Sequence, residues 1–246
     1  MEKIAVITGA TSGIGLSVAE ELGKSGYTII ISGIVDEQGS EAVKQLGGIG
    51  IKAEYYNCNA MNEEEVNAFF KVVGEKYGKI DALINNVGGL GGRSRFEEMT
   101  TEFYRNVMAL NLDTVFFASR AAIPFLKKGT NASIINFASF AAYVGGGPGA
   151  GIYGASKAGV RTMTVALAKD LAEYGIRVNA VSPGTIDTAF HSATPREVVE
   201  SWKSNIVLGR LGEAKEVGTV IEFLVSEKAS FLTGEVIEIN GGQDFR

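Results

Sequence analysis

The stretch VITGATSGIGLSVAEEL, residues 6–22, places three glycines between an apolar run and an amphipathic pattern. Gly9, Gly13 and Gly15 permit a tight turn and let backbone N–H groups approach a phosphate closely. The N-terminus of the following helix adds a field that favours an anion. Three glycines could serve the turn alone, but the order of strand, turn and helix favours a nucleotide site in a parallel α/β sheet.

The same alternation of apolar runs and amphipathic patterns continues along the whole chain. It predicts one dinucleotide-binding and catalytic domain over residues 1–246, with a Rossmann-like, doubly wound, seven-stranded parallel sheet and helices on both faces. Ligands of such sheets bind beyond the carboxyl ends of the strands. The predicted strands are Ile4–Thr8, Thr28–Ser32, Lys52–Asn57, Ala82–Asn85, Ser133–Phe137, Arg177–Ser182 and Val236–Asn240. The predicted helices are Ile14–Lys24, Glu37–Leu46, Glu63–Tyr77, Glu102–Phe125, Tyr153–Tyr174 and Ala214–Val225.

Composition narrows the class of protein further. The chain carries a net charge of −5, which argues against a nucleic-acid surface. Its single cysteine, Cys58, allows no internal disulfide, and no His/Cys cluster suggests a metal site. No apolar run approaches the roughly 18 residues of a membrane span, and the start lacks the apolar region of a signal peptide. We therefore expect a cytoplasmic protein that contacts neither nucleic acid nor membrane.

The segment GIYGASKAGV, residues 151–160, puts Tyr153 and Lys157 on one face of a helix. A lysine ammonium near a phenol lowers the phenol pKa from about 10, so the tyrosine could exchange a proton near neutral pH. For this spacing alone, a surface Tyr–Lys pair is the simpler interpretation. Ser139, however, follows the apolar strand SIINF and lies beyond its carboxyl end. There its hydroxyl could hold a substrate oxygen against Tyr153, or merely serve a turn.

A further polar residue, Asn111, interrupts the apolar helical pattern VMALNLDTVFF, residues 107–117. A buried asparagine needs hydrogen-bond partners. It could make a structural hydrogen bond in the core, or it could hold a water on a proton path to Lys157.

These motifs together resemble those of the short-chain dehydrogenase/reductase family. The family has the same T-G-x-x-x-G-I-G turn, and it carries Asn, Ser, Tyr and Lys in this chain order. INNVGG at 84–89 and VNAVSPGTIDT at 178–188 are similar to two further stretches of the family, so the resemblance covers almost the whole chain. It implies an NAD(P)-dependent oxidoreductase that acts on CH–OH groups and assembles as a homotetramer.

The resemblance also implies a role for each site residue. Tyr153 would exchange the proton, Ser139 would polarise the carbonyl, Lys157 would lower the tyrosine pKa and hold the nicotinamide ribose, and Asn111 would anchor the relay water. Cofactor contacts are expected from Gly9, Thr11, Ser12, Gly13, Ile14, Gly15, Gly33, Ile34, Asn59, Ala60, Asn86, Gly88, Tyr153, Lys157, Pro183, Gly184, Ile186 and Thr188.

The segment ISGIVDEQGSEAV, residues 31–43, bears on the choice between NADP(H) and NAD(H). NAD-preferring members of the family usually have aspartate where this chain has Gly33, so no carboxylate there repels a 2′-phosphate. NADP-preferring members often have a basic residue where this chain has Ile34. The missing carboxylate favours NADP(H) slightly, although Asp36 or Glu37 could reach back.

Loops after later strands should contact the substrate. GGLGGRSRFEEM, residues 88–99, carries Arg93 and Arg95, and arginines pair bidentately with carboxylates. Beside a catalytic tyrosine they suggest a small anionic carbonyl substrate, while salt bridges to glutamates of the same loop are the alternative. The only histidine, His191, lies in a predicted lid. Substrate contacts are expected from Arg93, Ser139, Gly146, Tyr153 and His191.

A narrower resemblance rests on N-N-x-G-G-L-x-G-R-S, G-G-G-x-G-A-G and G-T-x-D-T-A-F-H. These stretches are similar to bacterial reductases of alginate metabolism, which reduce 4-deoxy-L-erythro-5-hexoseulose uronate (DEH) to 2-keto-3-deoxygluconate with NADPH or NADH. The alternatives are a 3-oxoacyl-(acyl-carrier-protein) reductase and a general sugar or alcohol dehydrogenase. A serine hydrolase would need the G-x-S-x-G elbow, which GASKA at 154–158 lacks. A non-catalytic nucleotide-binding regulator would not need all four polar side chains.

Overall fold

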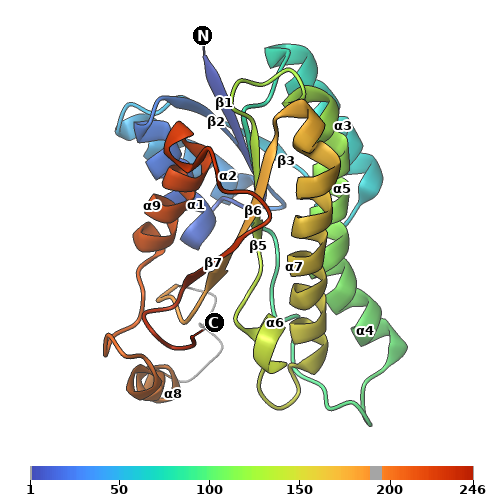
Figure 1. The fold of residues 1–246 in the computed structure, drawn as a ribbon, viewed down its shortest axis with the longest axis vertical. Helices are drawn as coiled ribbons and strands as arrows, with labels where there is room; N and C mark the ends of the chain where they lie inside the picture. The colour runs from blue at the N-terminus through green and yellow to red at the C-terminus, as the bar shows by residue number, and fades with distance from the viewer. Residues whose placement is uncertain (1, 189–195, 246) are drawn as a thin grey trace.

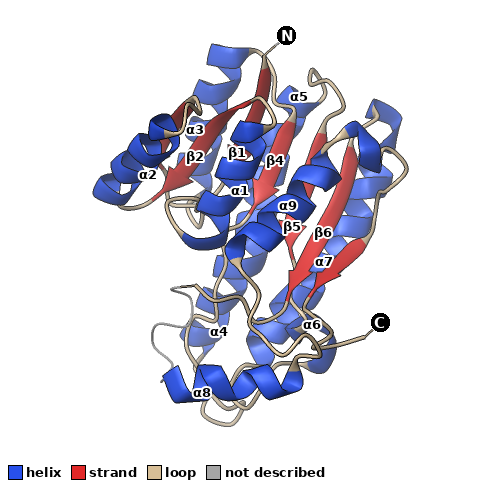
Figure 2. Cartoon of the chain, turned by 90° about the vertical axis from the view of Figure 1, so that its left-hand side faces the viewer, coloured by secondary structure: helices blue, strands red, loops and turns tan. Residues whose placement is uncertain are grey.

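The computed structural model describes residues 2–188 and 196–245, and within them one parallel sheet has the strand order β3-β2-β1-β4-β5-β6-β7. Figures 1 and 2 show helices on both of its faces. The Rossmann-like, doubly wound fold predicted from the sequence is therefore confirmed. The strands are β1 (Lys3–Ile7), β2 (Tyr27–Gly33), β3 (Ala53–Asn57), β4 (Ala82–Asn85), β5 (Ser133–Phe137), β6 (Arg177–Pro183) and β7 (Val236–Ile239).

Two apolar layers hold the helices to the sheet. One lies under α1, α2 and α9, and the other lies under α3, α5 and α7. None of the described helices is both long and apolar enough to cross a membrane. The helices are α1 (Gly13–Lys24), α2 (Asp36–Gly48), α3 (Glu63–Tyr77), α4 (Thr101–Met108), α5 (Thr114–Leu126), α6 (Ala141–Val144), α7 (Gly151–Leu171), α8 (Arg196–Ser201) and α9 (Ala214–Val225).

The strand order reverses between β1 and β4, and this reversal positions the site. β1 pairs with β2 on one side and with β4 on the other, so Val6 lies between Ile30 and Leu83. The connections that leave β1 and β4 therefore diverge to opposite faces of the sheet and open a crevice at its carboxyl edge. The glycine-rich turn of residues 9–15 lies at this crevice.

The predicted helix Glu102–Phe125 is wrong as a single regular helix. α4 and α5 are joined by a π-helical turn, η1 (Ala109–Asp113), which contains Asn111. The Asn111 side-chain Nδ2 donates to the Val107 carbonyl at 3.0 Å and to the Gly89 carbonyl at 2.8 Å. A side chain that donates to a helix carbonyl competes with the backbone N–H that would otherwise bond to the same carbonyl. This competition accounts for the wider, π-helical turn. The short helices α6 and α8 were not predicted either.

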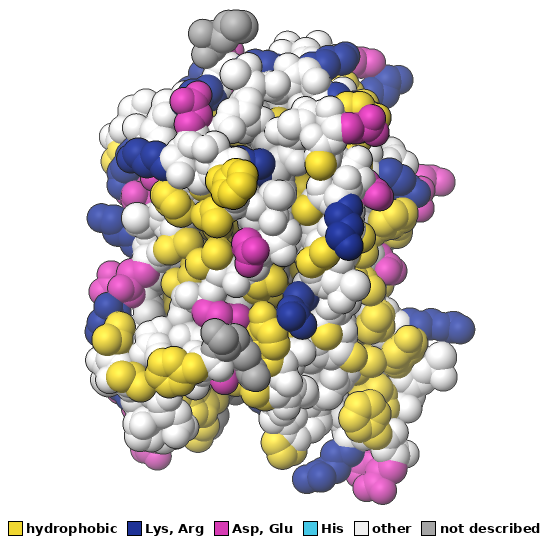
Figure 3. All heavy atoms as spheres, in the orientation of Figure 1, with side chains coloured by type: hydrophobic (Ala, Val, Ile, Leu, Met, Phe, Trp, Pro, Cys, Tyr) yellow, Lys and Arg dark blue, Asp and Glu magenta, His cyan; other side chains and the backbone are white. Residues whose placement is uncertain are grey.

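A belt of hydrophobic side chains is exposed on one face of the molecule. Figure 3 shows it along the face where β7 forms the edge of the sheet, between α9 and α7. Phe231, which precedes β7, is fully exposed, and Phe223 on α9 is partly exposed. Such a continuous apolar surface is a feature of contact sites.

The packing of α3 against α5 yields a test of the fold. A Cβ added to Gly74 on α3 would overlap the Phe125 ring, whereas a Cβ on Gly47 of α2 would meet no atom within 4 Å. We expect Gly74→Ala to lower the free energy of unfolding by about 1–3 kcal/mol through overpacking. Gly47→Ala should raise it by about 0.5–1 kcal/mol, because alanine loses less backbone entropy. Urea denaturation measures both, and equal effects at the two positions would contradict this packing.

Candidate active site

The glycine-rich turn after β1 forms a close-fitting cradle. Gly9 and Gly13 have left-handed backbone angles, with φ of 62° and 57°. A Cβ on Gly9 would lie 2.7 Å from Val87 Cγ2, and one on Gly15 would lie 2.6 Å from Asn86 Nδ2. Asn86 Nδ2 also donates to the Gly9 carbonyl at 2.8 Å. The turn after β1 and the loop after β4 are thus joined, and only glycine fits at these positions.

Backbone donors and open space make this cradle suitable for a phosphate. Ser12 is the N-cap of α1 and makes no capping hydrogen bond with its side chain. Thr188, in the loop after β6, lies opposite the turn, with its Cβ 3.9 Å from the position of a Cβ on Gly13. An uncapped helix N-terminus beneath a covering loop fits the pyrophosphate of a dinucleotide.

The predicted adenosine end lies at the carboxyl ends of β2 and β3. Ile34 is 69% exposed and Ala60 is buried. A Cβ on Gly33 would lie 2.7 Å from Thr11 Cγ2, so an aspartate there would displace Thr11. Asp36 Oδ1 accepts from Asn57 Nδ2 at 2.7 Å and from the Tyr55 hydroxyl at 3.2 Å. The same hydroxyl bonds to the Gly33 carbonyl at 3.1 Å, so the Asp36 carboxylate lies near the end of β2.

The four predicted catalytic side chains meet at the next part of the same edge. Ser139 follows β5, and Tyr153 and Lys157 occupy successive turns of α7. The Ser139 hydroxyl hydrogen-bonds to the Tyr153 phenol. A Cβ on Gly88 would lie 2.8 Å from Lys157 Nζ and 2.9 Å from Asn111 Oδ1, so both polar groups border Gly88.

The electrostatics of this group differ from the sequence-based expectation. Burial raises the pKa of Tyr153 above its ordinary value, and the hydrogen bond from Ser139 lowers it in part. Lys157 Nζ donates to the Phe137 carbonyl at 2.7 Å and lies 5.9 Å from the centre of the Tyr153 ring. Burial lowers the pKa of this lysine to about 8. The phenol is thus protonated at neutral pH, and burial strengthens its hold on the proton, whereas the sequence predicts that Lys157 weakens it.

The two glycine-rich loops near Tyr153 are joined to each other. Arg93 Nη1 donates to the Pro148 carbonyl at 3.0 Å, and the Phe96 ring lies so close to Gly151 that a Cβ there would be 2.7 Å from Cε2. Among the described ion pairs none joins Arg93 or Arg95 to a glutamate of their own loop. Gly146 also lies in this region, with φ of 74°. His191 lies outside the described residues.

A buried polar network lies beneath the catalytic group, and it was not predicted from the sequence. Asn85 Nδ2 donates to Ser119 Oγ at 2.9 Å and to Asn136 Oδ1 at 2.8 Å. Asn136 Nδ2 donates to Thr164 Oγ1 at 2.9 Å. The network joins β4 and β5 to α5 and α7. Its sequence signal was the presence of asparagine within two otherwise apolar strands.

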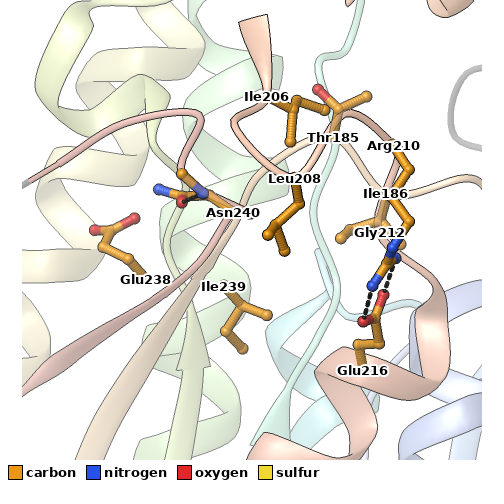
Figure 4. Close-up of a pocket in the computed structure, with 12 residues that line it drawn as sticks. Thr185, Ile186, Ile206, Leu208, Arg210, Gly212, Glu216, Glu238, Ile239 and Asn240 are labelled. Atoms are coloured by element: carbon orange, nitrogen blue, oxygen red, sulfur yellow. Dashed lines mark hydrogen bonds and ion pairs between the residues drawn. The ribbon is translucent and has the colours of Figure 1, made fainter. Parts of the chain in front are cut away.

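A separate cavity of about 290 Å³ lies beyond the ends of β6 and β7. Figure 4 shows apolar side chains around it, with Arg210 and Glu216 paired on one side. None of the four predicted catalytic residues is among the described residues that line it. Its described lining is Thr185, Ile186, Ile206, Leu208, Arg210, Gly212, Glu216, Glu238, Ile239, Asn240, Gly241 and Gly242.

Comparisons with known proteins agree with this architecture. A family model described as Enoyl-(Acyl carrier protein) reductase matches residues 9–244. The 3-oxoacyl-(acyl-carrier-protein) reductase FabG of Thermotoga maritima is 39% identical, over 98% of this chain and 97% of its own. The NADP-dependent (R)-specific alcohol dehydrogenase of Lentilactobacillus kefiri is 34% identical, over 98% and 96%. A short-chain dehydrogenase/reductase structure from Brucella melitensis, titled glucose/ribitol dehydrogenase, has a TM-score of 0.92 at 33% identity, with both chains fully covered.

These findings define the class as an oxidoreductase that acts on CH–OH groups. The chain belongs to the short-chain dehydrogenase/reductase family, whose enzymes use NAD(H) or NADP(H). None of the relatives named above is a uronate reductase. The comparisons therefore support the 3-oxoacyl reductase and alcohol dehydrogenase alternatives better than the alginate interpretation.

The buried lysine yields a pH-dependent prediction. The pKa of Lys157 is about 8 in the folded protein, against 10.5 for a free lysine side chain. Below pH 8 the Lys157 amine is protonated in the folded and in the unfolded protein, and the folded protein bears the full cost of burying its charge. Between pH 8 and pH 10.5 the amine is protonated in the unfolded chain but neutral in the folded protein, so the free energy of unfolding rises with pH.

We expect the stability of the natural protein, measured relative to Lys157→Met, to rise by about 3 kcal/mol from about pH 8 to about pH 10.5. Denaturant titrations at several pH values measure this difference, in which other titrating groups cancel. Parallel stability curves for the two proteins would contradict the burial of a charged lysine.

Proposed function

We propose that this chain is an NAD(P)H-dependent reductase that converts a ketone into a secondary alcohol. The proposal rests on one observation: a phosphate-type glycine cradle, the Ser139–Tyr153 pair and the buried Lys157 lie along one edge of the sheet. When bound, the reduced nicotinamide supplies the hydride, and the protein orients and polarises the substrate.

Ser139 and Tyr153 act together on the substrate oxygen. Because the Ser139 hydroxyl lies beside the Tyr153 phenol, an oxygen placed between them accepts hydrogen bonds from both groups once the Ser139 O–H turns from the phenol to that oxygen. Negative charge that develops on this oxygen is stabilised by these donors. The raised pKa of Tyr153 keeps its proton in place at neutral pH, so the phenol acts as the general acid.

Lys157 and Asn111 act behind the tyrosine. Both side chains border Gly88, and Lys157 lies one helical turn from Tyr153 on α7. The pKa of about 8 lets Lys157 hold or release a proton near neutral pH. Lys157 therefore restores the tyrosine proton, and Asn111 Oδ1, which accepts the Gly89 N–H at 3.0 Å, fixes the geometry of this path.

The substrate class that the observations favour is a 3-oxoacyl group carried as a thioester. The relative from Thermotoga maritima bears this activity in its name and matches nearly the whole chain. Two exposed apolar side chains lie on segments next to Tyr153. Phe96, whose ring packs against Gly151, is 75% exposed, and Val144 on α6 is 48% exposed. Such side chains suit an acyl chain better than a sugar.

A small acidic keto sugar, such as DEH, is the second candidate, and Arg93 favours it. Arg93 is exposed on the loop that meets residues 147–151, and its bond to Pro148 uses one of five N–H donors. The remaining donors could bind a carboxylate. As cofactor we infer NADP(H) before NAD(H), because no carboxylate occupies position 33 and one relative is named as NADP-dependent.

The homotetramer and the cytoplasmic location stay predictions from the sequence. For the tetramer, the belt of exposed apolar side chains beside β7 is the face that we expect a second copy to cover (Figure 3).

Replacement of the general acid tests the reaction. Tyr153→Phe should lower turnover by about 10²–10⁴-fold, because only the proton-donating hydroxyl is lost. Cofactor affinity should stay within about twofold, since the ring remains. Tyr174→Phe, at an exposed tyrosine beyond the end of α7, is the matched control and should keep full activity. Steady-state kinetics and NADPH titration measure both, and an active Tyr153→Phe enzyme would reject the mechanism.

Two loop variants distinguish the substrate classes. The substrate panel consists of acetoacetyl thioesters, keto-uronates such as DEH, and neutral ketones. Phe96→Ala should raise KM for the thioester by about tenfold, because apolar contact with the acyl chain is lost. If an acidic sugar is the substrate, Arg93→Ala raises KM for keto-uronates more than for neutral ketones. Arg95→Ala, exposed on the same loop, is the control. Efficient turnover of keto-uronates alone would overturn the 3-oxoacyl proposal.

A further inference from the structure

The loop after β6 is packed at one residue and open at its neighbour. Ile186 is buried in the apolar layer under α1 and α9, whereas Thr185 is only partly buried. Thr185 and Ile186 line the 290 Å³ cavity, whose opposite wall includes Ile206, Leu208 and Ile239 (Figure 4). Thr185 lacks packing partners on the side that faces the cavity. The hydrogen bonds that Thr185 makes therefore help to fix the start of the loop Gly184–Thr188.

One set of these hydrogen bonds comes from the segment before α9. The Gly212 N–H donates to the Thr185 carbonyl at 3.0 Å, and the Asp187 N–H donates to the Gly212 carbonyl at 2.8 Å. These are backbone bonds, so they fix the spacing of the two segments but do not depend on a particular side chain.

The second set comes from a side chain of the C-terminal turn. The Thr185 N–H donates to Gln243 Oε1 at 2.9 Å, and Gln243 Nε2 donates to Thr185 Oγ1 at 3.1 Å. The same amide lies against the loop backbone, since a Cβ on Gly184 would be 2.7 Å from Gln243 Oε1. Gln243 thus satisfies the backbone and the side chain of one loop residue together.

The C-terminal turn is itself rigidly held. Asn240 Oδ1 accepts the Gly242 N–H at 3.0 Å, and Asn240 Nδ2 donates to the Asp244 carbonyl at 3.0 Å. The Leu208 N–H donates to the Gly241 carbonyl at 3.0 Å. One short turn therefore contacts both Thr185 and Leu208, which lie at the two ends of the segment that contains α8.

We propose that Gln243 is a positioning residue for the loop Gly184–Thr188 and, through it, for the part of a bound dinucleotide that runs from the pyrophosphate toward Tyr153. This inference rests on the proposed function. The loop ends at Thr188, opposite the glycine-rich turn at Gly13, so a displaced loop changes the space above that turn. The adenosine end is expected at Ile34 and Ala60, which follow β2 and β3. These strands lie at the opposite edge of the sheet from β7, which precedes Gln243.

Binding of whole and half cofactors tests the proposal. Gln243→Met keeps the length of the side chain and removes both hydrogen-bonding groups. If the variant leaves the loop correctly placed for only a fraction of the time, the apparent Kd rises by the inverse of that fraction. We expect the Kd of NADH and NADPH to rise about fivefold to tenfold, with the Kd of adenosine and 2′-AMP, which carry no pyrophosphate, unchanged within about twofold.

Two further variants support the interpretation. Gln45→Met, at an exposed position on α2, is the matched control and should change neither Kd. Thr185→Val removes the hydroxyl partner and should weaken only the whole cofactors, and the double variant should show less than the sum of the single effects. If Gln243→Met fails to fold, Thr185→Val carries the same test.

Each outcome is decisive. Unchanged binding of NADH and NADPH by Gln243→Met overturns the positioning role. An equal loss for 2′-AMP and the whole cofactors overturns it too, because it would indicate a general loss of structure. If the natural protein binds neither NADH nor NADPH, the proposed function itself fails, and the inference fails with it.

Discussion

The hydrogen bonds of Asn136 determine where the catalytic helix lies. Its side chain accepts from Asn85 on the neighbouring strand and donates to Thr164 on α7, and all three residues are buried. A buried carboxamide that lost one of these partners would keep the desolvation cost without the compensating bond. α7 is therefore held to β5 at a fixed register, and β5 carries Ser139 at its end. The contact between Ser139 and Tyr153 depends on this register.

The same burial determines the charge state of the site. A phenol removed from water holds its proton more tightly, and an ammonium removed from water releases its proton more easily. Tyr153 and Lys157 follow these two rules in opposite directions. At neutral pH the phenol is therefore protonated, which is the form that the proposed reduction of a ketone needs, although its raised pKa makes it a weaker acid. The four-residue spacing alone predicts the opposite sign for the tyrosine pKa shift, because it reports the neighbouring charge and not the desolvation.

Features that depend on local pattern could be predicted from the sequence. The buried strands are short apolar runs, and the turn at Gly9–Gly15 is marked by its glycines. The sheet was therefore predicted correctly, and the predicted catalytic residues lie along its carboxyl edge. Contacts between distant segments could not be predicted. Arg93 was expected to be free or paired with a glutamate, yet its partner is a backbone carbonyl at Pro148, 55 positions away. The bond between Thr185 and Gln243 spans 58 positions and has no signal in either segment.

The loops on the two sides of the crevice are held in different ways. This difference bears on which loop affects substrate choice and which affects cofactor binding. On the substrate side, the loop at 88–99 is fastened to residues 147–151 by the Arg93 bond and by the Phe96 ring against Gly151, where glycine lets the chains approach closely. On the other side, the loop after β6 lies over a cavity and is placed by hydrogen bonds. A wall fixed by close packing resists change, because any added atom overlaps a neighbour. A loop that borders a void depends instead on its hydrogen bonds for its position. We therefore expect substitutions in the first wall to act on substrate choice and substitutions in the second to act on cofactor affinity.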